Sequence, residues 1–210
     1  MNDSQTIETE SKKFEILCGL TLAVFAAILA ITDLGAGKYG DDEIIGHNDK
    51  SAAYAWYQSK SIKESLTVGQ HDTLKVLVES GSIRQEQLPA MKKLLADLEA
   101  DIARYKKEKK EILLGSAKVG KENWIQDVDG KLGQIVGAKE YDELVEKLGK
   151  AGDYFDMAVF FLQLSLVMGA ISLVVQIPRM KNIFYGVMAL LGAAGLVYSI
   201  IAFRAAGAFA

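Results

Sequence analysis

Three long apolar runs dominate the hydropathy pattern of the chain, at residues 14–32, 155–177 and 183–203. Each is about as long as the roughly 20 residues that a helix needs to cross the hydrocarbon core of a bilayer. The residues between the first and second runs are largely polar and charged, and Pro89 is their only proline. The pattern therefore predicts an integral membrane protein with three spans and one polar insert between spans one and two.

The first apolar run has two possible interpretations, a cleaved signal peptide or a retained anchor. It is longer than the roughly 7–15 residues of a signal-peptide core, and the acidic residues Asp3, Glu8 and Glu10 precede it. We therefore expect a transmembrane helix at residues 14–32, preceded by a short tail at residues 1–13.

The insert begins with four glycines, which predict a flexible connector over residues 33–48. Asn48 or Asp49 can then cap a helix that runs from residue 49 to about residue 80, and Gly81 is suited to end it. Pro89 suits the first turn of a second helix over residues 88–114. The insert therefore predicts two helices joined by a short turn, together covering residues 49–114.

Each of these two helices carries a stripe of apolar residues. In the second helix the apolar positions recur in steps of three and four, at Leu88, Met91, Leu95, Leu98, Ile102, Tyr105 and Ile112. The first helix offers a stripe with Ala55, Ile62, Leu66, Thr73 and Val76, and with the small residues Ser59 and Gly69 between them. The predicted fold is therefore all-α, with three transmembrane helices and a long antiparallel coiled-coil hairpin inserted between spans one and two. A helical pair buries little by itself, so we expect its remaining apolar surface to meet other subunits.

The rest of the insert has two parts. Residues 115–137 are rich in glycine, and Trp124 and Ile125 lie either on the membrane surface or in an irregular loop with one buried tryptophan. Residues 138–154 are amphipathic, with Tyr141, Leu144 and Val145 on one face, and no proline separates them from the second apolar run. This second part is therefore predicted to be a helix that leads into the membrane.

Charge and cysteine content exclude several classes of protein. Between Lys38 and Asp153 there are 19 Lys and Arg residues against 21 Asp and Glu residues. That balance argues against a nucleic-acid surface and against a polybasic lipid-binding patch. The only cysteine, Cys18, lies inside the first apolar run, so the chain forms no internal disulfide and has no cysteine-based metal site.

Positive charge near the spans predicts the orientation in the membrane. Lys12 and Lys13 precede the first span, Arg179 and Lys181 lie in the turn before the third, and Arg204 follows it. The positive-inside rule then places the N-terminus in the cytoplasm and the hairpin on the exoplasmic side. Two further lysines at residues 147 and 150 flank the second span on the insert side and weaken this asymmetry.

Several segments together resemble a bacterial family, the one numbered 4337 in the domain-of-unknown-function series. They are the stretches AYAWYQSKSIKESL and YKKEKKEI and the closing segment FDMAVFFLQLSLVMGAISLVV with its basic turn and final apolar helix. The glycine-rich segment at residues 115–137 is longer than the family pattern suggests. The resemblance implies a multi-pass protein of the bacterial inner membrane and implies no activity.

Catalytic and metal-binding patterns are missing from the sequence. His47 and His71, the only histidines, lack the spacing of metal ligands on one helix face. The acidic residues around His47 can gather a divalent cation, but they lack the alternating ligands of an EF-hand, so a solvated acidic loop is favoured. Neither a phosphate-binding glycine loop nor a serine nucleophile with a partner base is recognisable. We therefore expect no enzyme, no cofactor and no metal.

Aromatic and small residues are the remaining candidates for interaction. Tyr54, Trp56 and Tyr57 form either a recognition surface for a partner, or packing at the base of the hairpin or at the membrane interface. Within the spans, small residues recur at intervals of four, which lets helices approach closely. These residues are Gly19, Ala23, Ala27, Ser165, Gly169, Ala189, Ala193, Gly195 and Ser199.

The predicted function follows from these packing faces. We expect a homo-oligomer that contacts membrane lipids and acts as a scaffold or as an accessory subunit with other subunits of a membrane complex. Gln163 in the second span favours a bond to another helix, since a glutamine in lipid needs a partner. The alternative is an oligomeric channel lined by the second span around Gln163.

Overall fold

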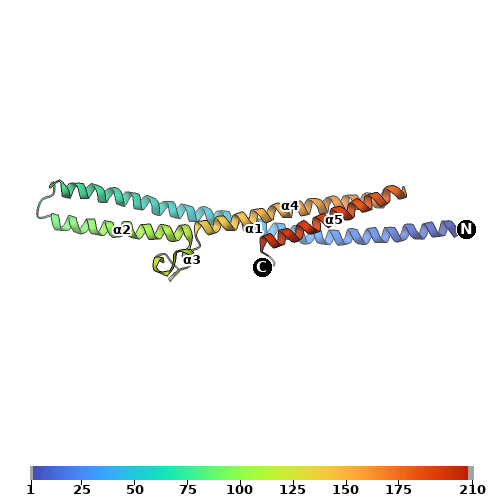
Figure 1. Ribbon diagram of the computed structural model, residues 1–210, viewed down its shortest axis with the longest axis horizontal. Helices are drawn as coiled ribbons and strands as arrows, with labels where there is room; N and C mark the ends of the chain where they lie inside the picture. Colours follow the sequence, from blue (N-terminus) through green and yellow to red (C-terminus); the bar gives the residue numbers. More distant parts are fainter. Residues whose placement is uncertain (1, 208–210) are drawn as a thin grey trace. The chain divides into compact units, whose positions relative to one another are not determined.

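The computed structural model describes the backbone of residues 2–207 and the side chains of residues 12–207. Nearly all of the described chain is helical, which confirms the predicted all-α class (Figure 1). The elements in chain order are the helices α1 (Asn2–Glu79), α2 (Leu88–Leu114) and α3 (Ser116–Val119), the 3-10 helix η1 (Lys121–Asn123), the strands β1 (Asp127–Val128) and β2 (Lys131–Leu132), and the helices α4 (Ala138–Val174) and α5 (Pro178–Ala206).

Three of these helices, α1, α4 and α5, are long and apolar enough to cross a membrane. This confirms the three apolar helices predicted from the hydropathy pattern and indicates that the protein associates with a membrane. Residues 138–154 and most of the second apolar run belong to one helix, α4, which ends at Val174. The third run lies within α5, which already begins at Pro178.

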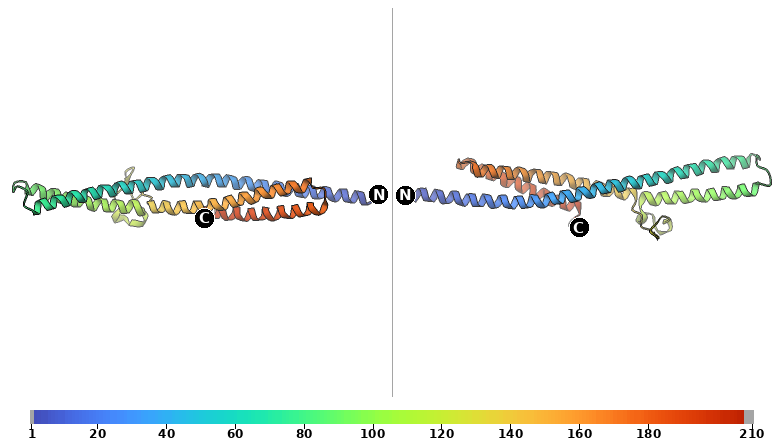
Figure 2. Two further views of the ribbon diagram at one scale, coloured as in Figure 1. Left: turned by 90° about the horizontal axis from the view of Figure 1, so that it is seen from above. Right: turned by 180° about the vertical axis from the view of Figure 1, so that it is seen from behind.

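The described chain forms two compact units, made of residues 2–44 with 146–207 and of Ile45–Val145. We call them the span unit and the hairpin unit. In the span unit, the first part of α1 lies beside α4 and α5 (Figure 2). In the hairpin unit, the remainder of α1 and α2 run antiparallel and are joined by residues 80–87 (Figure 2).

Small and hydroxylated residues bring the helices of the span unit together. A Cβ atom built on Gly192 would lie 2.2 Å from the ring of Phe25, and one on Gly195 would lie 2.6 Å from Leu162. Hydroxyl groups join the helices as well, since Thr32 Oγ1 and Ser199 Oγ are 2.8 Å apart. Close backbone approach and satisfied polar groups are typical of helices packed in a membrane.

The glycine-rich connector expected at residues 33–48 is helical in the structure, because α1 runs through it without a break. Gly35 faces the ring of Phe203 in the span unit, and Gly46 faces Val145 in the hairpin unit. Packing against these neighbours offsets the helix cost of glycine, about 1 kcal/mol per residue. Gly37 and Gly40 have no such neighbour. The helix start expected at Asn48 or Asp49 is also absent, since both residues lie within α1.

Residues 115–137 form a small folded loop rather than an extended connection. It contains α3, η1 and an antiparallel pair of two-residue strands in which Val128 pairs with Lys131. Gly137 packs so closely on α2 that an added Cβ would lie 2.2 Å from the backbone nitrogen of Gly115. The loop is therefore held against the end of α2 by backbone contact.

Candidate interaction surfaces

Half-buried ion pairs hold α1 against α2 in the hairpin unit. Lys60 Nζ lies 2.6 Å from Glu108 Oε2, and both side chains are less than one-fifth exposed. In a second ion pair the charges are exchanged between the helices, since Lys109 on α2 pairs with Glu64 on α1. Because removing one partner of such a pair leaves a buried charge uncompensated, these contacts fix how the two helices are aligned.

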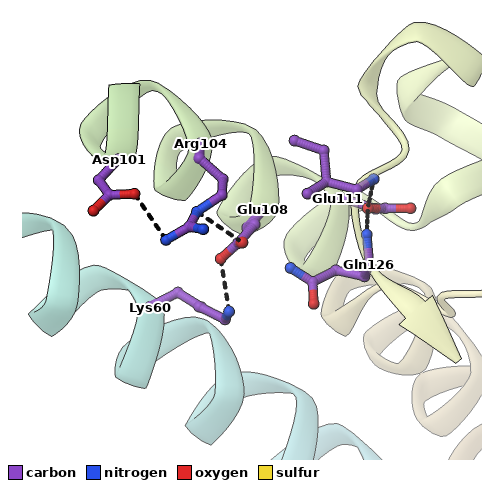
Figure 3. Close-up of polar contacts among 7 residues, drawn as sticks. Lys60, Asp101, Arg104, Glu108, Glu111 and Gln126 are labelled. Carbon is purple, nitrogen blue, oxygen red and sulfur yellow. Dashed lines mark hydrogen bonds and ion pairs between the residues drawn. The ribbon is translucent and has the colours of Figure 1, made fainter. Parts of the chain in front are cut away.

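Further charged groups extend the network along α2. Arg104 Nη2 lies 2.9 Å from Asp101 Oδ1, and Arg104 Nε lies 3.7 Å from Glu108 (Figure 3). The ammonium groups also lie over aromatic rings, with Lys109 Nζ 5.7 Å from the centroid of Tyr57. Where these contacts occur, α1 therefore presents charged and aromatic side chains to α2.

The apolar stripe of α1 lies on another face and is exposed, contrary to the packing predicted from the sequence. We call Ala55, Ser59, Ile62, Leu66, Gly69, Thr73 and Val76 the outer stripe. Ile62, Leu66 and Val76 are 58%, 62% and 63% exposed. The physical reason is the charge pairing, which turns Lys60 and Glu64 toward α2 and the outer stripe away from it.

The predicted seam of α2 is more enclosed than the outer stripe. Ile112 is fully buried, and the other members are half-buried. These half-buried members are Leu88, Met91, Leu95, Leu98, Ile102 and Tyr105.

A groove of about 650 Å³ runs along the hairpin beside the outer stripe. Leu66, Gly69 and Thr73 of α1 line one side of it, and Leu94 and Leu98 of α2 line the other. A Cβ built on Gly69 would point into open space. The hairpin therefore presents a mainly apolar hollow where the outer stripe has its glycine.

The aromatic cluster of α1 is divided among three surroundings. The Tyr54 hydroxyl donates to Asp142 Oδ2 at 2.5 Å, and Trp56 lines a hollow of about 290 Å³ with Tyr141. Tyr57 lies beneath Lys109. The three rings therefore do not form one surface, and each contributes to packing within the hairpin unit.

Asp142 links the start of α4 to α1. It accepts a hydrogen bond from Tyr54 and lies 2.7 Å from Lys50 Nζ. The ammonium of Lys50 and then the Tyr54 hydroxyl hold the pKa of Asp142 below its ordinary value. The same bond to Asp142, together with burial, raises the pKa of Tyr54.

Glu111 is a buried carboxylate that the sequence did not single out. It accepts a hydrogen bond from the Ser116 hydroxyl at 2.7 Å and one from the backbone N–H of Ile125 at 2.9 Å. It also accepts the backbone N–H of Gln126 at 2.9 Å (Figure 3). Ser116 Oγ in turn accepts the N–H of Ile135. The only sequence signal was an acidic residue at the start of the apolar run EILL, just before Gly115.

Trp124 is held inside the small loop. Its indole N–H donates to the carbonyl oxygen of Ser116 at 2.8 Å, and its ring packs on Gly133. Of the two alternatives from the sequence, the geometry matches a half-buried tryptophan in a folded loop.

The small residues of the spans fall into two groups. Ser165, Gly169, Gly195 and Ser199 are buried among the helices of the same chain. Ala23, Ala27 and Ala193 are exposed, Ala189 is half-buried, and a Cβ on Gly19 would meet nothing within 4 Å. Gln163 is also exposed, on the outer surface of α4.

Among the side chains of residues 12–207, no group of three or more His, Cys, Asp and Glu residues is arranged to hold a metal ion. His47, expected in an acidic loop, is an exposed residue of α1. His71 contacts Asp72 at 3.0 Å and Glu99 at 3.2 Å, so it joins α1 to α2 near the hairpin turn.

These features define a helical protein with three apolar helices suited to a membrane and a polar hairpin braced by ion pairs. A family model described as a domain of unknown function, DUF4337, matches residues 14–205, and the chain belongs to this family. No curated protein and no solved structure matches the chain.

Proposed function

We propose that the protein is a non-enzymatic scaffold or accessory subunit of a membrane complex, and that it assembles with copies of itself in a bacterial inner membrane. The observation that carries this proposal is the exposed position of Gln163 within the second apolar run. In hydrocarbon an amide side chain has no water to bond, so a polar group from another helix stabilises it. A second copy of the chain offers such a group.

The first span gives independent support. Gly19, Ala23 and Ala27 lie at intervals of four; Ala23 and Ala27 are exposed, and Gly19 is half-buried with open space where a Cβ would lie. Faces of this kind allow close helix association in a bilayer. In contrast, Gly169 and Gly195 already serve packing within the chain. The first span therefore keeps a surface suited to another molecule.

The experiment that tests self-assembly compares Gln163→Leu with the control Met157→Leu. Both residues are exposed on α4, but they lie on different sides of the helix. We expect light scattering in mild detergent to give a mass well above the 22.9 kDa of one chain for the unaltered protein and for the control. Gln163→Leu should shift the population toward smaller species. Monomers under all conditions would overturn the proposal.

The same residue supports a second candidate function, an oligomeric channel. A ring of copies with Gln163 turned toward a shared axis would line a pore with amides. The expected result is conductance in reconstituted bilayers that Gln163→Leu abolishes. An assembly of defined size without conductance across ionic conditions would leave the scaffold and exclude the channel.

A further inference from the structure

The outer stripe has a strict repeat of seven residues. Its members follow one another in alternating steps of four and three, from Ala55 through Ser59, Ile62 and Leu66 to Val76, and none of its seven members is charged. A regular helix has 3.6 residues per turn, so a stripe of period 3.5 stays aligned only with another helix that coils around it. The sequence of the outer stripe is therefore suited to a partner helix.

That partner helix does not come from the described part of the same hairpin. α2 contacts α1 through Lys60 and Glu64, which lie on a different face from the outer stripe. The large members of the outer stripe remain more than half exposed. The second helix must then belong to another molecule.

We propose that the outer stripe packs in parallel against the outer stripe of a second copy of this chain. The inference rests on the proposed self-assembly and assigns it a surface outside the apolar runs. α1 contains both the first apolar run and the outer stripe. Copies inserted in one membrane with one orientation therefore present this helix in the same direction. The same number of residues separates the outer stripe from the span in each copy. Each residue of the outer stripe therefore lies beside the same residue of the second copy.

The residues beside the outer stripe are compatible with this pairing. In a parallel coiled coil, core residues occupy heptad positions a and d, and positions e and g flank them. The residue at position g of one helix lies near the residue at position e, five residues further along, on the partner helix. This rule pairs Gln58 with Lys63, Ser65 with Gln70 and Asp72 with Leu77 of the second copy. No pair joins like charges, so two identical stripes meet without repulsion.

The groove beside Gly69 gives the pairing a specific contact. In a parallel pair, each Leu66 lies between Ile62 and Gly69 of the other copy. The groove of about 650 Å³ at Gly69 provides room for that side chain, and Leu94 and Leu98 form its far wall. By two-fold symmetry both copies make the same contact. The occupant of the groove is therefore Leu66 of a second copy.

The test uses cysteine cross-linking of the full chain in proteoliposomes. Cys18 is first replaced by alanine, and Leu66→Cys is compared with Lys75→Cys, an exposed position of α1 outside the outer stripe. We expect mild oxidation to form a covalent dimer several-fold more efficiently at residue 66 than at residue 75. Equal yields at the two positions would overturn the inference, because they would indicate random collision.

A second variant separates this inference from the proposed function. Leu66→Glu adds a charge to an exposed site, so the hairpin should stay folded, which circular dichroism checks, while association weakens. If the unaltered protein assembles but Leu66→Glu has no effect and residue 66 does not cross-link, the outer stripe is not the interface although self-assembly stands. If the unaltered protein is monomeric, the proposed function and the inference fail together.

Discussion

At the scale of single residues, charged groups determine how the hairpin is built. Lys60 and Glu64 on α1 meet Glu108 and Lys109 on α2, with opposite charges at matched positions. Hydrophobic pattern alone would have turned the outer stripe inward. The ion pairs turn it outward, because Lys60 and Glu64 lie on a different face of α1 from the outer stripe, and removing one partner of a buried pair costs about 3–5 kcal/mol.

His71 gives a prediction on pH at this scale. The neighbouring Asp72 carboxylate, and then Glu99, raise its pKa above the ordinary value of about 6.5. The protonated ring is therefore favoured in the folded hairpin. Its stabilising contribution is complete below about pH 6.5 and is lost as the pH rises through the raised pKa.

The measurement is an NMR titration of the histidine side chains, with His47→Gln to assign the signals. We expect a pKa for His71 above 6.5, lowered more by Asp72→Asn than by Glu99→Gln. Asp97→Asn is the control on α2. A pKa that Asp72→Asn leaves unchanged would contradict this explanation.

At the scale of elements, Glu111 joins α2 to the small loop of residues 115–137. Glu111→Ala removes the acceptor of the buried N–H of Gln126. It also removes the acceptor of the Ser116 hydroxyl. Each unsatisfied buried donor costs about 1–3 kcal/mol, so we expect a loss of at least about 2 kcal/mol in the free energy of unfolding.

Denaturant unfolding followed by the fluorescence of Trp124, in a Trp56→Phe background, measures this loss. Glu111→Gln retains one acceptor oxygen. Its free energy of unfolding should therefore lie between those of the unaltered protein and Glu111→Ala. The exposed Glu86 provides the control, as Glu86→Ala. Equal stability of Glu111→Ala and Glu86→Ala would show that the carboxylate does not hold the loop.

Several elements could be predicted from the sequence, and others could not. Apolar runs of sufficient length identified the three long helices, since few other structures bury so many consecutive apolar residues. The glycines of residues 33–48 were misleading, because Gly35 and Gly46 lie within α1 where other helices approach. The direction of the outer stripe and the role of Glu111 depend on contacts between residues far apart in the sequence, which periodicity alone does not contain.

At the scale of the whole molecule, one continuous helix, α1, contains the first apolar run and the first arm of the hairpin. Basic residues near the first and third spans predict a cytoplasmic N-terminus and an exoplasmic hairpin. Within the span unit, Lys181 Nζ lies 3.4 Å from Glu15, so both of these basic regions belong to the same end of the bundle. The positive-inside rule then predicts that this shared end faces the cytoplasm.

Cysteine labelling in intact cells tests that orientation. In a Cys18→Ala background, Ser82→Cys at the hairpin turn should react with a membrane-impermeant maleimide. The control Asn182→Cys, at the start of α5, should react only after permeabilisation. The reverse labelling pattern would place the hairpin in the cytoplasm.

Self-assembly in the membrane is the central claim, and the mass of the protein in its lipid environment tests it most directly. Native mass spectrometry of the full chain released from lipid nanodiscs gives that mass. We predict one dominant species at an integral multiple, two or greater, of the 22.9 kDa chain mass. A single species at the mass of one chain, over the whole range of protein-to-lipid ratios, would contradict it.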